Sequence, residues 1–130
     1  MVLHPLLLLS LLAAPATDVA AMRWEKRVLL VRASGAHDPS LLAQRRILQR
    51  WRTGAAERDL VLVEVQGETV VGASDTAARL RRRYRLPDTG FMVVLIGKDG
   101  GVKLRQSRPI AAAALEETID AMPMRRSGKR

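Results

Sequence analysis

Three runs of apolar residues predict strands that are covered on both faces. Residues 27–33 contain the run VLLV, residues 60–65 read LVLVEV, and residues 91–96 read FMVVLI. Continuous apolar runs of this length are typical of buried strands, whereas strands with one wet face alternate apolar and polar positions. These three segments therefore predict the centre of a β-sheet.

The sequence after the third run predicts a hairpin and an edge strand. An Asp-Gly pair follows that run, and this pair is a strong signal for a tight turn between antiparallel strands. Residues 102–105 then alternate between apolar and basic side chains. We expect Val102 and Leu104 to face the core, with Lys103 and Arg105 in water.

Helical periodicity predicts a first helix over about residues 40–58. Asp38 can cap its amino end, and Pro39 is favoured at the first helical position. The apolar positions recur at helical spacing and predict the buried face. These positions are Leu41, Ile47, Leu48, Trp51 and Ala55.

Two further helices are predicted in the second half of the chain. One begins at a cap on Ser74 or Asp75 and runs to about residue 85, and the other ends before Pro123. The inward positions are Ala77, Leu80 and Tyr84 in the former and Ala112, Leu115, Ile119 and Met122 in the latter. Between the second strand and this first helix, residues 68–73 are expected to form a connector.

The predicted element order is βαβ, then α, then ββα. This order predicts an α/β fold with a four-stranded mixed sheet flanked by helices, in which the first two strands form a right-handed parallel unit. Periodicity does not give the direction of the third strand, so a small flavodoxin-like parallel sheet stays open as an alternative.

Composition excludes several classes of chemistry. The chain has 130 residues, enough for one domain, with no cysteine and two histidines. It therefore has no disulfide, thiolate metal site or cysteine nucleophile. We expect no catalytic residue, no cofactor and no metal site. The formal net charge is +9, which favours anionic partners.

The first 21 residues resemble a secretory signal. Their apolar run is shorter than a membrane span and is followed by small residues suited to cleavage after Ala16 or Ala21. We expect a domain over residues 22–126, a frayed basic tail over residues 127–130, no transmembrane helix in the mature chain, and a periplasmic or secreted location. The alternative is a cytoplasmic protein whose translation starts at Met22.

Three segments carry a resemblance to a known family. They are RVLLV at residues 27–31, GKDGGVKLR at 97–105 and IDAMPMRR at 119–126. Together they resemble an uncharacterised thioredoxin- and peroxiredoxin-like "domain of unknown function" of exported bacterial proteins. That family also occurs in animal sushi-repeat and extracellular-matrix proteins. Residues 84–100 are also similar to the second half of thioredoxins. The resemblance implies a thioredoxin-like fold and an exported location but no particular reaction.

The sequence departs from redox members of the thioredoxin superfamily at two places. Where their redox cysteines follow the first strand, residues 34–38 read SGAHD. Where they have a cis-proline before the third strand, Gly90 or Phe91 stands here. We therefore expect a redox-inactive protein. A histidine in that loop, His37, has no partner visible in the sequence for acid–base chemistry.

The densest positive charge lies on the second predicted helix. It is formed by Arg79, Arg81, Arg82, Arg83 and Arg85. Such a face can bind an anionic polymer, but it is also the ordinary solvated face of an arginine-rich helix, and few aromatic residues are available to stack on bases. We expect an exported binding or structural module without redox chemistry, whose partner is an envelope protein or an anionic polymer. The alternative is the cytoplasmic polyanion-binding protein.

Overall fold

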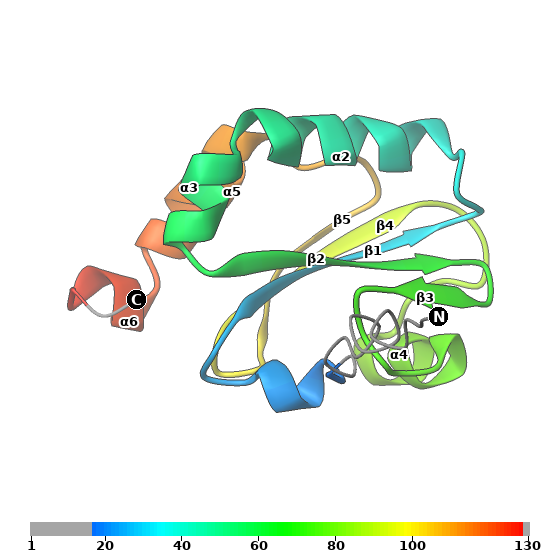
Figure 1. Ribbon diagram of the computed structural model, residues 1–130, viewed down its shortest axis with the longest axis horizontal. Coiled ribbons are helices and arrows are strands. Elements are labelled where there is room, and N and C mark those ends of the chain that lie inside the picture. The colour runs from blue at the N-terminus through cyan, green and yellow to red at the C-terminus, as the bar shows by residue number, and fades with distance from the viewer. Residues whose placement is uncertain (1–16, 129–130) are drawn as a thin grey trace, which may run out of the picture.

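The computed structural model describes residues 17–128, which form a five-stranded mixed sheet flanked by helices (Figure 1). The strands are β1 (Arg27–Ala33), β2 (Leu60–Gln66), β3 (Thr69–Val71), β4 (Met92–Ile96) and β5 (Val102–Gln106). The helices are η1 (Ala20–Met22), α2 (Pro39–Arg50), α3 (Arg52–Glu57), α4 (Ala77–Tyr84), α5 (Ala112–Asp120) and α6 (Pro123–Arg126).

The sheet has the strand order β3-β2-β1-β4-β5. β1 pairs in parallel with β2 and antiparallel with β4, which excludes the all-parallel alternative. The four predicted strands are present, and β3 is a fifth strand that the sequence did not predict. It pairs with the end of β2 inside the stretch expected to be a connector.

Helices cover both faces of the sheet, and β1 supplies residues to both layers. α2, α3 and α5 lie on one face, and α4 lies on the other (Figure 1). Leu29 and Val31 pack in the cluster under α2, α3 and α5, whereas Val28 and Leu30 pack in the cluster against α4. Every residue of β1 is buried, as the continuous apolar run predicts.

The first predicted helix is broken into two. α2 ends at Arg50 and α3 begins at Arg52, with Trp51 out of helical geometry between them (φ −109°, ψ 21°). The predicted cap is confirmed, because the Asp38 carboxylate accepts a hydrogen bond from the backbone N–H of Ser40 at 2.8 Å.

One polar residue of α2, Gln44, is fully buried, although it was not among the predicted buried positions. Its side-chain amide binds both backbone groups of Ile110: Oε1 accepts from the Ile110 N–H at 2.7 Å, and Nε2 donates to the Ile110 carbonyl at 3.0 Å. This reciprocal pair satisfies the buried backbone just before α5.

The predicted cap of the second helix is wrong. α4 is capped by the side chain of Thr76, which accepts from the Arg79 N–H at 3.1 Å. Asp75 instead accepts a hydrogen bond from the backbone N–H of Val19, at 2.8 Å. The predicted inward positions of this helix, Ala77, Leu80 and Tyr84, are all buried.

Val19 belongs to the segment that was expected to be a signal peptide. Residues 1–16 of that segment, like residues 129–130 of the basic tail, lie outside the described residues. Residues 17–21 are described, and Val19 is 4% exposed within the cluster that packs against α4.

The predicted orientation of β5 is only partly correct. Leu104 packs against the core, but Val102 is 46% exposed. The pairing of β4 with β5 shifts between Leu95 and Ile96, and this irregularity breaks the simple alternation on which the prediction rested.

The end of the chain also differs from expectation. Pro123 does not merely end a helix, because it stands in the first turn of the short helix α6. Proline is favoured there since the first turn of a helix leaves its N–H groups unpaired. The chain is therefore helical again from Pro123 to Arg126, just before the predicted tail.

Candidate ligand cavity at the amino end of β1

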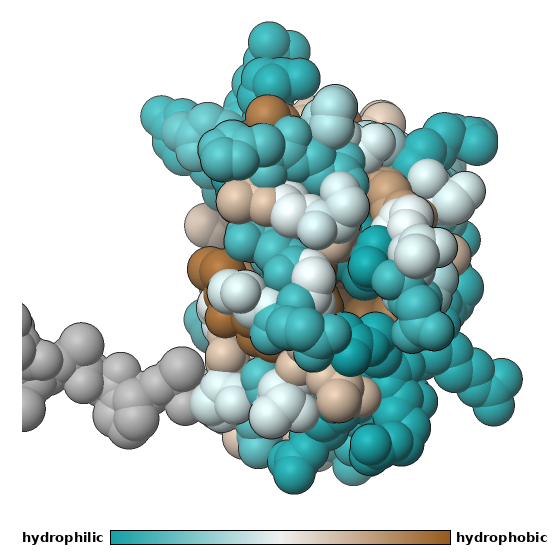
Figure 2. All heavy atoms as spheres, turned by 90° about the vertical axis from the view of Figure 1, so that its right-hand side faces the viewer, coloured by the Kyte–Doolittle hydropathy of each residue, from teal (hydrophilic) through white to brown (hydrophobic). Residues whose placement is uncertain are grey.

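A buried arginine lies at the end of the sheet where β1 and β2 finish. Arg32, in β1, is 5% exposed, and its two amino groups donate to the backbone carbonyls of Asp88 and Gly90. These carbonyls belong to the loop that precedes β4, where redox relatives of the resembled fold were expected to have proline. Figure 2 shows this end of the molecule, and hydrophilic side chains cover most of it.

The loop after β1 forms a helix cap. The other oxygen of the Asp38 carboxylate accepts from the N–H and hydroxyl of Ser34. Burial alone would raise the pKa of Asp38, but these bonds and the one from Ser40 outweigh it and lower that pKa. His37 is exposed. Both carboxylate oxygens of Asp38 are therefore used in hydrogen bonds that hold the loop and cap α2.

Two arginines of the cluster on α4 bind other side chains of the protein. Arg81 pairs with Glu68 at 3.0 Å, and Arg83 donates to the hydroxyl of Tyr84. Arg79 and Arg82 are exposed and border a cavity of about 210 Å³.

Two acids, Asp18 and Asp75, also line that cavity. Their carboxylates oppose a bound polyanion by like charge. Arg85 is exposed at the carboxyl end of α4, in the left-handed region at φ 53°. Four of the five predicted residues lie on α4, and Arg85 follows its last residue. Arg79, Arg82 and Arg83 line the same cavity, whereas Arg81 is engaged with Glu68.

The three segments that carry the family resemblance meet at the opposite end of the sheet. This is the end where β1 begins, where β4 turns into β5, and where α6 lies (Figure 1). A cavity of about 250 Å³ opens between these segments. We call it the β1 cavity; its lining residues are Trp24, Arg27, Lys98, Asp99, Lys103, Met122, Pro123 and Met124.

Trp24 is an exposed aromatic residue in a constrained conformation. Its side chain is 56% exposed, and its backbone has φ 72°, in the left-handed region that disfavours bulky residues. A backbone hydrogen bond of 2.6 Å to the Lys98 carbonyl holds it there. The guanidinium of Arg23 stacks on the indole, 5.0 Å from the ring centroid. Strain of this kind persists where the surrounding structure imposes it, often at binding sites.

Arg27 is a buried cation at the wall of the same cavity. It is 1% exposed, and its Nε donates to the Met122 sulfur at 3.4 Å and its Nη1 to the Arg58 carbonyl at 2.7 Å. These bonds use two of the five N–H donors of a guanidinium. Among residues 17–128, no ion pair includes Arg27. Burial, and then the charge of Arg125, lower its pKa from the usual range.

The other charged residues of the cavity form pairs. Lys98, which is 6% exposed, binds Asp59 at 2.8 Å, and Lys103 binds Asp99 at 2.9 Å. A bond from the Gly101 N–H and then the pairing with Lys103 lower the pKa of Asp99. Each lysine thus has a carboxylate at ion-pair distance, whereas no ion pair among the described residues includes Arg27, on which Asp59 and Asp120 act only as nearby charges.

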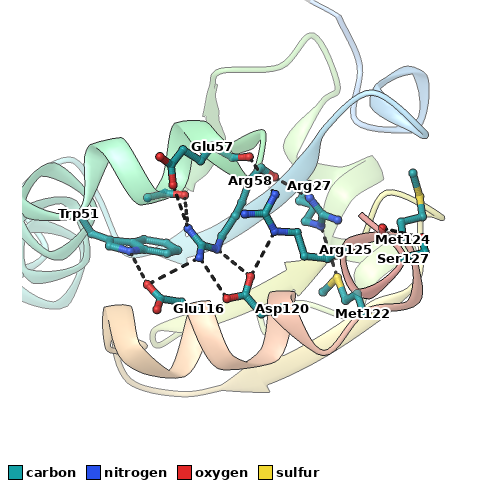
Figure 3. A network of polar contacts seen from close by, with 11 residues as sticks. Arg27, Trp51, Glu57, Arg58, Glu116, Asp120, Met122, Met124, Arg125 and Ser127 are labelled. Atoms are coloured by element: carbon teal, nitrogen blue, oxygen red, sulfur yellow. Dashed lines mark hydrogen bonds and ion pairs between the residues drawn. The ribbon is translucent and has the colours of Figure 1, made fainter. Parts of the chain in front are cut away.

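A network beside the cavity holds Arg27 in place (Figure 3). Arg58 donates to both oxygens of Asp120, and Arg125 donates to one of them. Bonds from Arg58 lower the pKa of Asp120. The Arg58 carbonyl accepts from Arg27, and the Asp120 carboxylate accepts from Arg58 and Arg125. The charges of Asp59 and Asp120 also act on Arg27 and raise its pKa, against the larger lowering by burial and Arg125.

The sequence reasoning did not identify this cavity. Trp24, Arg27 and Met122 come from segments far apart in the chain, and only folding brings them together. One signal was present: Arg27 directly precedes an apolar run predicted to be buried, and a charge at that place needs a partner. The described residues contain no cluster of three metal-ligating side chains.

Among residues 17–128, no helix combines the length and the apolar character needed to cross a membrane.

The comparisons with known proteins agree with the extent of the fold. No curated protein matches the sequence. One family profile matches residues 18–128, which include every strand and helix that the structure describes. Because this match covers most of the chain, the protein belongs to the family described as Domain of unknown function (DUF4174).

Proposed function

We propose that the protein is an exported, redox-inactive binding module with a thioredoxin-like fold, and that the β1 cavity is its binding site. The observation that carries the proposal is the buried guanidinium of Arg27, which forms no ion pair among the described residues and lies at the wall of a cavity of about 250 Å³. A buried charge costs free energy unless it is paired. A ligand that supplies the missing charge recovers that cost.

The exposed indole of Trp24 supports the same site. An exposed aromatic side chain held by the backbone offers a large apolar surface at little cost in conformational entropy. The apolar side chains of Met122 and Met124 line the cavity as well. The site therefore offers an apolar surface beside a fixed positive charge.

Two observations favour this module over the cytoplasmic polyanion-binding alternative. A chain that starts at Met22 lacks Val19, which is buried in the core. The arginines of α4 are partly engaged with Glu68 and Tyr84. We propose a periplasmic or secreted location on these grounds.

The experiment is a fragment screen by NMR on the purified protein, with labelled indole N–H groups and methionine methyl groups. We expect hits to shift the signals of Trp24, Met122 and Met124. Trp51 is the internal reference, because its indole donates to Glu116 and does not line the cavity. If no fragment moves the cavity signals, or if hits move Trp51 alone, the proposal is wrong.

A further inference from the structure

We infer that the ligand of the β1 cavity is a small organic acid with one negative charge and an apolar body, bound through its carboxylate to Arg27. This inference rests on the proposed function and adds the chemical class of the ligand. It follows from the charge, the walls and the size of the cavity.

The charge of the cavity calls for one anionic group. Lys98 and Lys103 each form an ion pair with an aspartate of the protein. Arg27 forms no ion pair among the described residues, and Asp59 and Asp120 act on it only as nearby charges. A guanidinium matches a carboxylate in shape and forms strong, charge-assisted hydrogen bonds with it. A doubly charged phosphate would bring one charge more than the cavity can neutralise.

The walls of the cavity call for an apolar body. The ring of Trp24 and the side chains of Met122 and Met124 line it, and methionine adapts to irregular apolar shapes. In Figure 3, Arg27, Met122 and Met124 lie at the same end of the polar network, next to α6. An acid without an apolar part, such as acetate, would leave these walls uncovered.

The size of the cavity favours a small molecule. The volume of about 250 Å³ lies just below the range of about 300–1,000 Å³ that is typical of pockets for drug-sized ligands. This accommodates a single aromatic or short aliphatic acid. The carboxyl end of a polypeptide presents the same chemistry, so the test must separate these two sources.

The test measures dissociation constants by NMR titration of the Trp24 indole and the methionine methyl groups. The probes are benzoate, its neutral isostere benzamide, acetate, and a tripeptide that ends in phenylalanine with either a free or an amidated carboxyl group. We expect benzoate to bind at least about tenfold more tightly than benzamide, as removal of a charge-assisted bond predicts. Acetate and the amidated peptide should bind more weakly than benzoate.

Variants locate the charge that is recognised. Arg27→Met should weaken benzoate by about tenfold or more and leave benzamide unchanged. Because Arg27 also binds the Arg58 carbonyl, that variant can fail to fold, and Lys103→Glu is the second test. Lys103 is an exposed lining residue, so reversing its charge should weaken benzoate but not benzamide. Arg82→Glu, on α4, makes the same change in net charge away from the cavity and should leave both unchanged.

Each outcome decides the inference. Equal binding of benzoate and benzamide overturns the anionic class, while the cavity survives as an apolar site. If Lys103→Glu and Arg82→Glu weaken benzoate binding equally, the net charge of the protein explains the binding, and recognition at Arg27 is wrong. Binding of the free peptide but not of benzoate overturns the small acid. If no probe moves any cavity signal, the proposed function fails as well.

Discussion

The backbone N–H of Val19 donates a hydrogen bond of 2.8 Å to the carboxylate of Asp75, across 56 residues of sequence. The bond joins the first described residues to the loop before α4. A second link lies beside it, because the Ser74 N–H donates to the Thr17 carbonyl at 3.2 Å. Residues 17–19 are thus attached to the fold by side-chain burial and by hydrogen bonds.

These contacts distinguish the two expected cleavage sites. A chain that begins at Thr17 keeps Val19, and a chain that begins at Met22 loses it. We expect the Met22 chain to be less stable by about 2–4 kcal/mol, from one buried valine and its hydrogen bond. Urea unfolding of the two chains measures this difference, and the amino-terminal sequence of exported protein should begin at Thr17.

Val19→Ala in the Thr17 chain is the matched control, since it removes the buried side chain but keeps the backbone hydrogen bond. It should account for part of the loss only. Equal stability of the Thr17 and Met22 chains would show that residues 17–21 add nothing to the fold.

The second prediction concerns Arg105, which was expected simply to face water. Its guanidinium donates to the carbonyls of Tyr84 and Arg85, at the carboxyl end of α4. Helices leave their last carbonyls unpaired, so this side chain acts as a cap from another strand. Arg105→Ala should cost about 1 kcal/mol, whereas Lys103→Ala on the same strand should cost less than about 0.5 kcal/mol. Denaturant melts of both variants test this, and equal losses would contradict it.

The third prediction concerns acid stability. Glu64 is 4% exposed and binds Arg45 through both carboxylate oxygens, at 2.6 and 2.7 Å. Hydrogen bonds from Arg45 lower the pKa of Glu64 below its usual value, despite the opposing effect of burial. A lowered folded-state pKa stabilises the fold above the unfolded-state pKa, which is near 4, and this stabilisation is lost as the pH falls through the folded-state value.

The measurement is the free energy of unfolding in urea between about pH 7 and about pH 3. Glu64→Gln should be less stable at neutral pH and should lose less stability on acidification than the wild type. Glu117→Gln, an exposed change on α5, should follow the wild type. A wild-type slope in the Glu64→Gln protein would mean that this ion pair does not contribute to the acid response.

The fourth prediction concerns polyanions. A net charge of +9 attracts DNA and heparin at low salt, but the arginines of α4 face nearby acids. We expect weak binding without preference for one polymer, lost by about 150 mM salt. Arg79→Ala or Arg82→Ala should reduce the low-salt binding more than Arg81→Ala, because Arg81 is already paired with Glu68.

Fluorescence titrations with labelled DNA, RNA and heparin over a salt series test this. A submicromolar complex with one polymer at physiological salt, lost in the Arg79→Ala, Arg82→Ala double variant, would support the polyanion-binding alternative instead.

Local periodicity predicted the elements of the fold well. The buried runs and the helical stripes were visible because strands and helices repeat over short distances. β3 was missed because its three residues lie between Gly67 and Gly72 and show no period. The exposure of Val102 was missed because an irregular pairing depends on two strands and is not written in either one.

The β1 cavity could not be predicted from short stretches of sequence. The arginine cluster stood out since its members are adjacent in sequence. The β1 cavity did not, because its walls come from distant segments and its key property is a missing partner. Whether Arg27 has a carboxylate beside it depends on where Asp120 points, and that is a property of the folded chain.

The two buried arginines of β1 have a consequence for how the strand finds its place. Arg27 and Arg32 stand near its two ends and, by the alternation of a strand, point to opposite faces of the sheet. Each guanidinium meets carbonyls that only one alignment provides. A slip of β1 by one residue would move each guanidinium to the opposite face of the sheet, away from the carbonyls to which it donates. The two arginines therefore favour the observed alignment of β1 through hydrogen bonds, which are more directional than the contacts of its apolar residues.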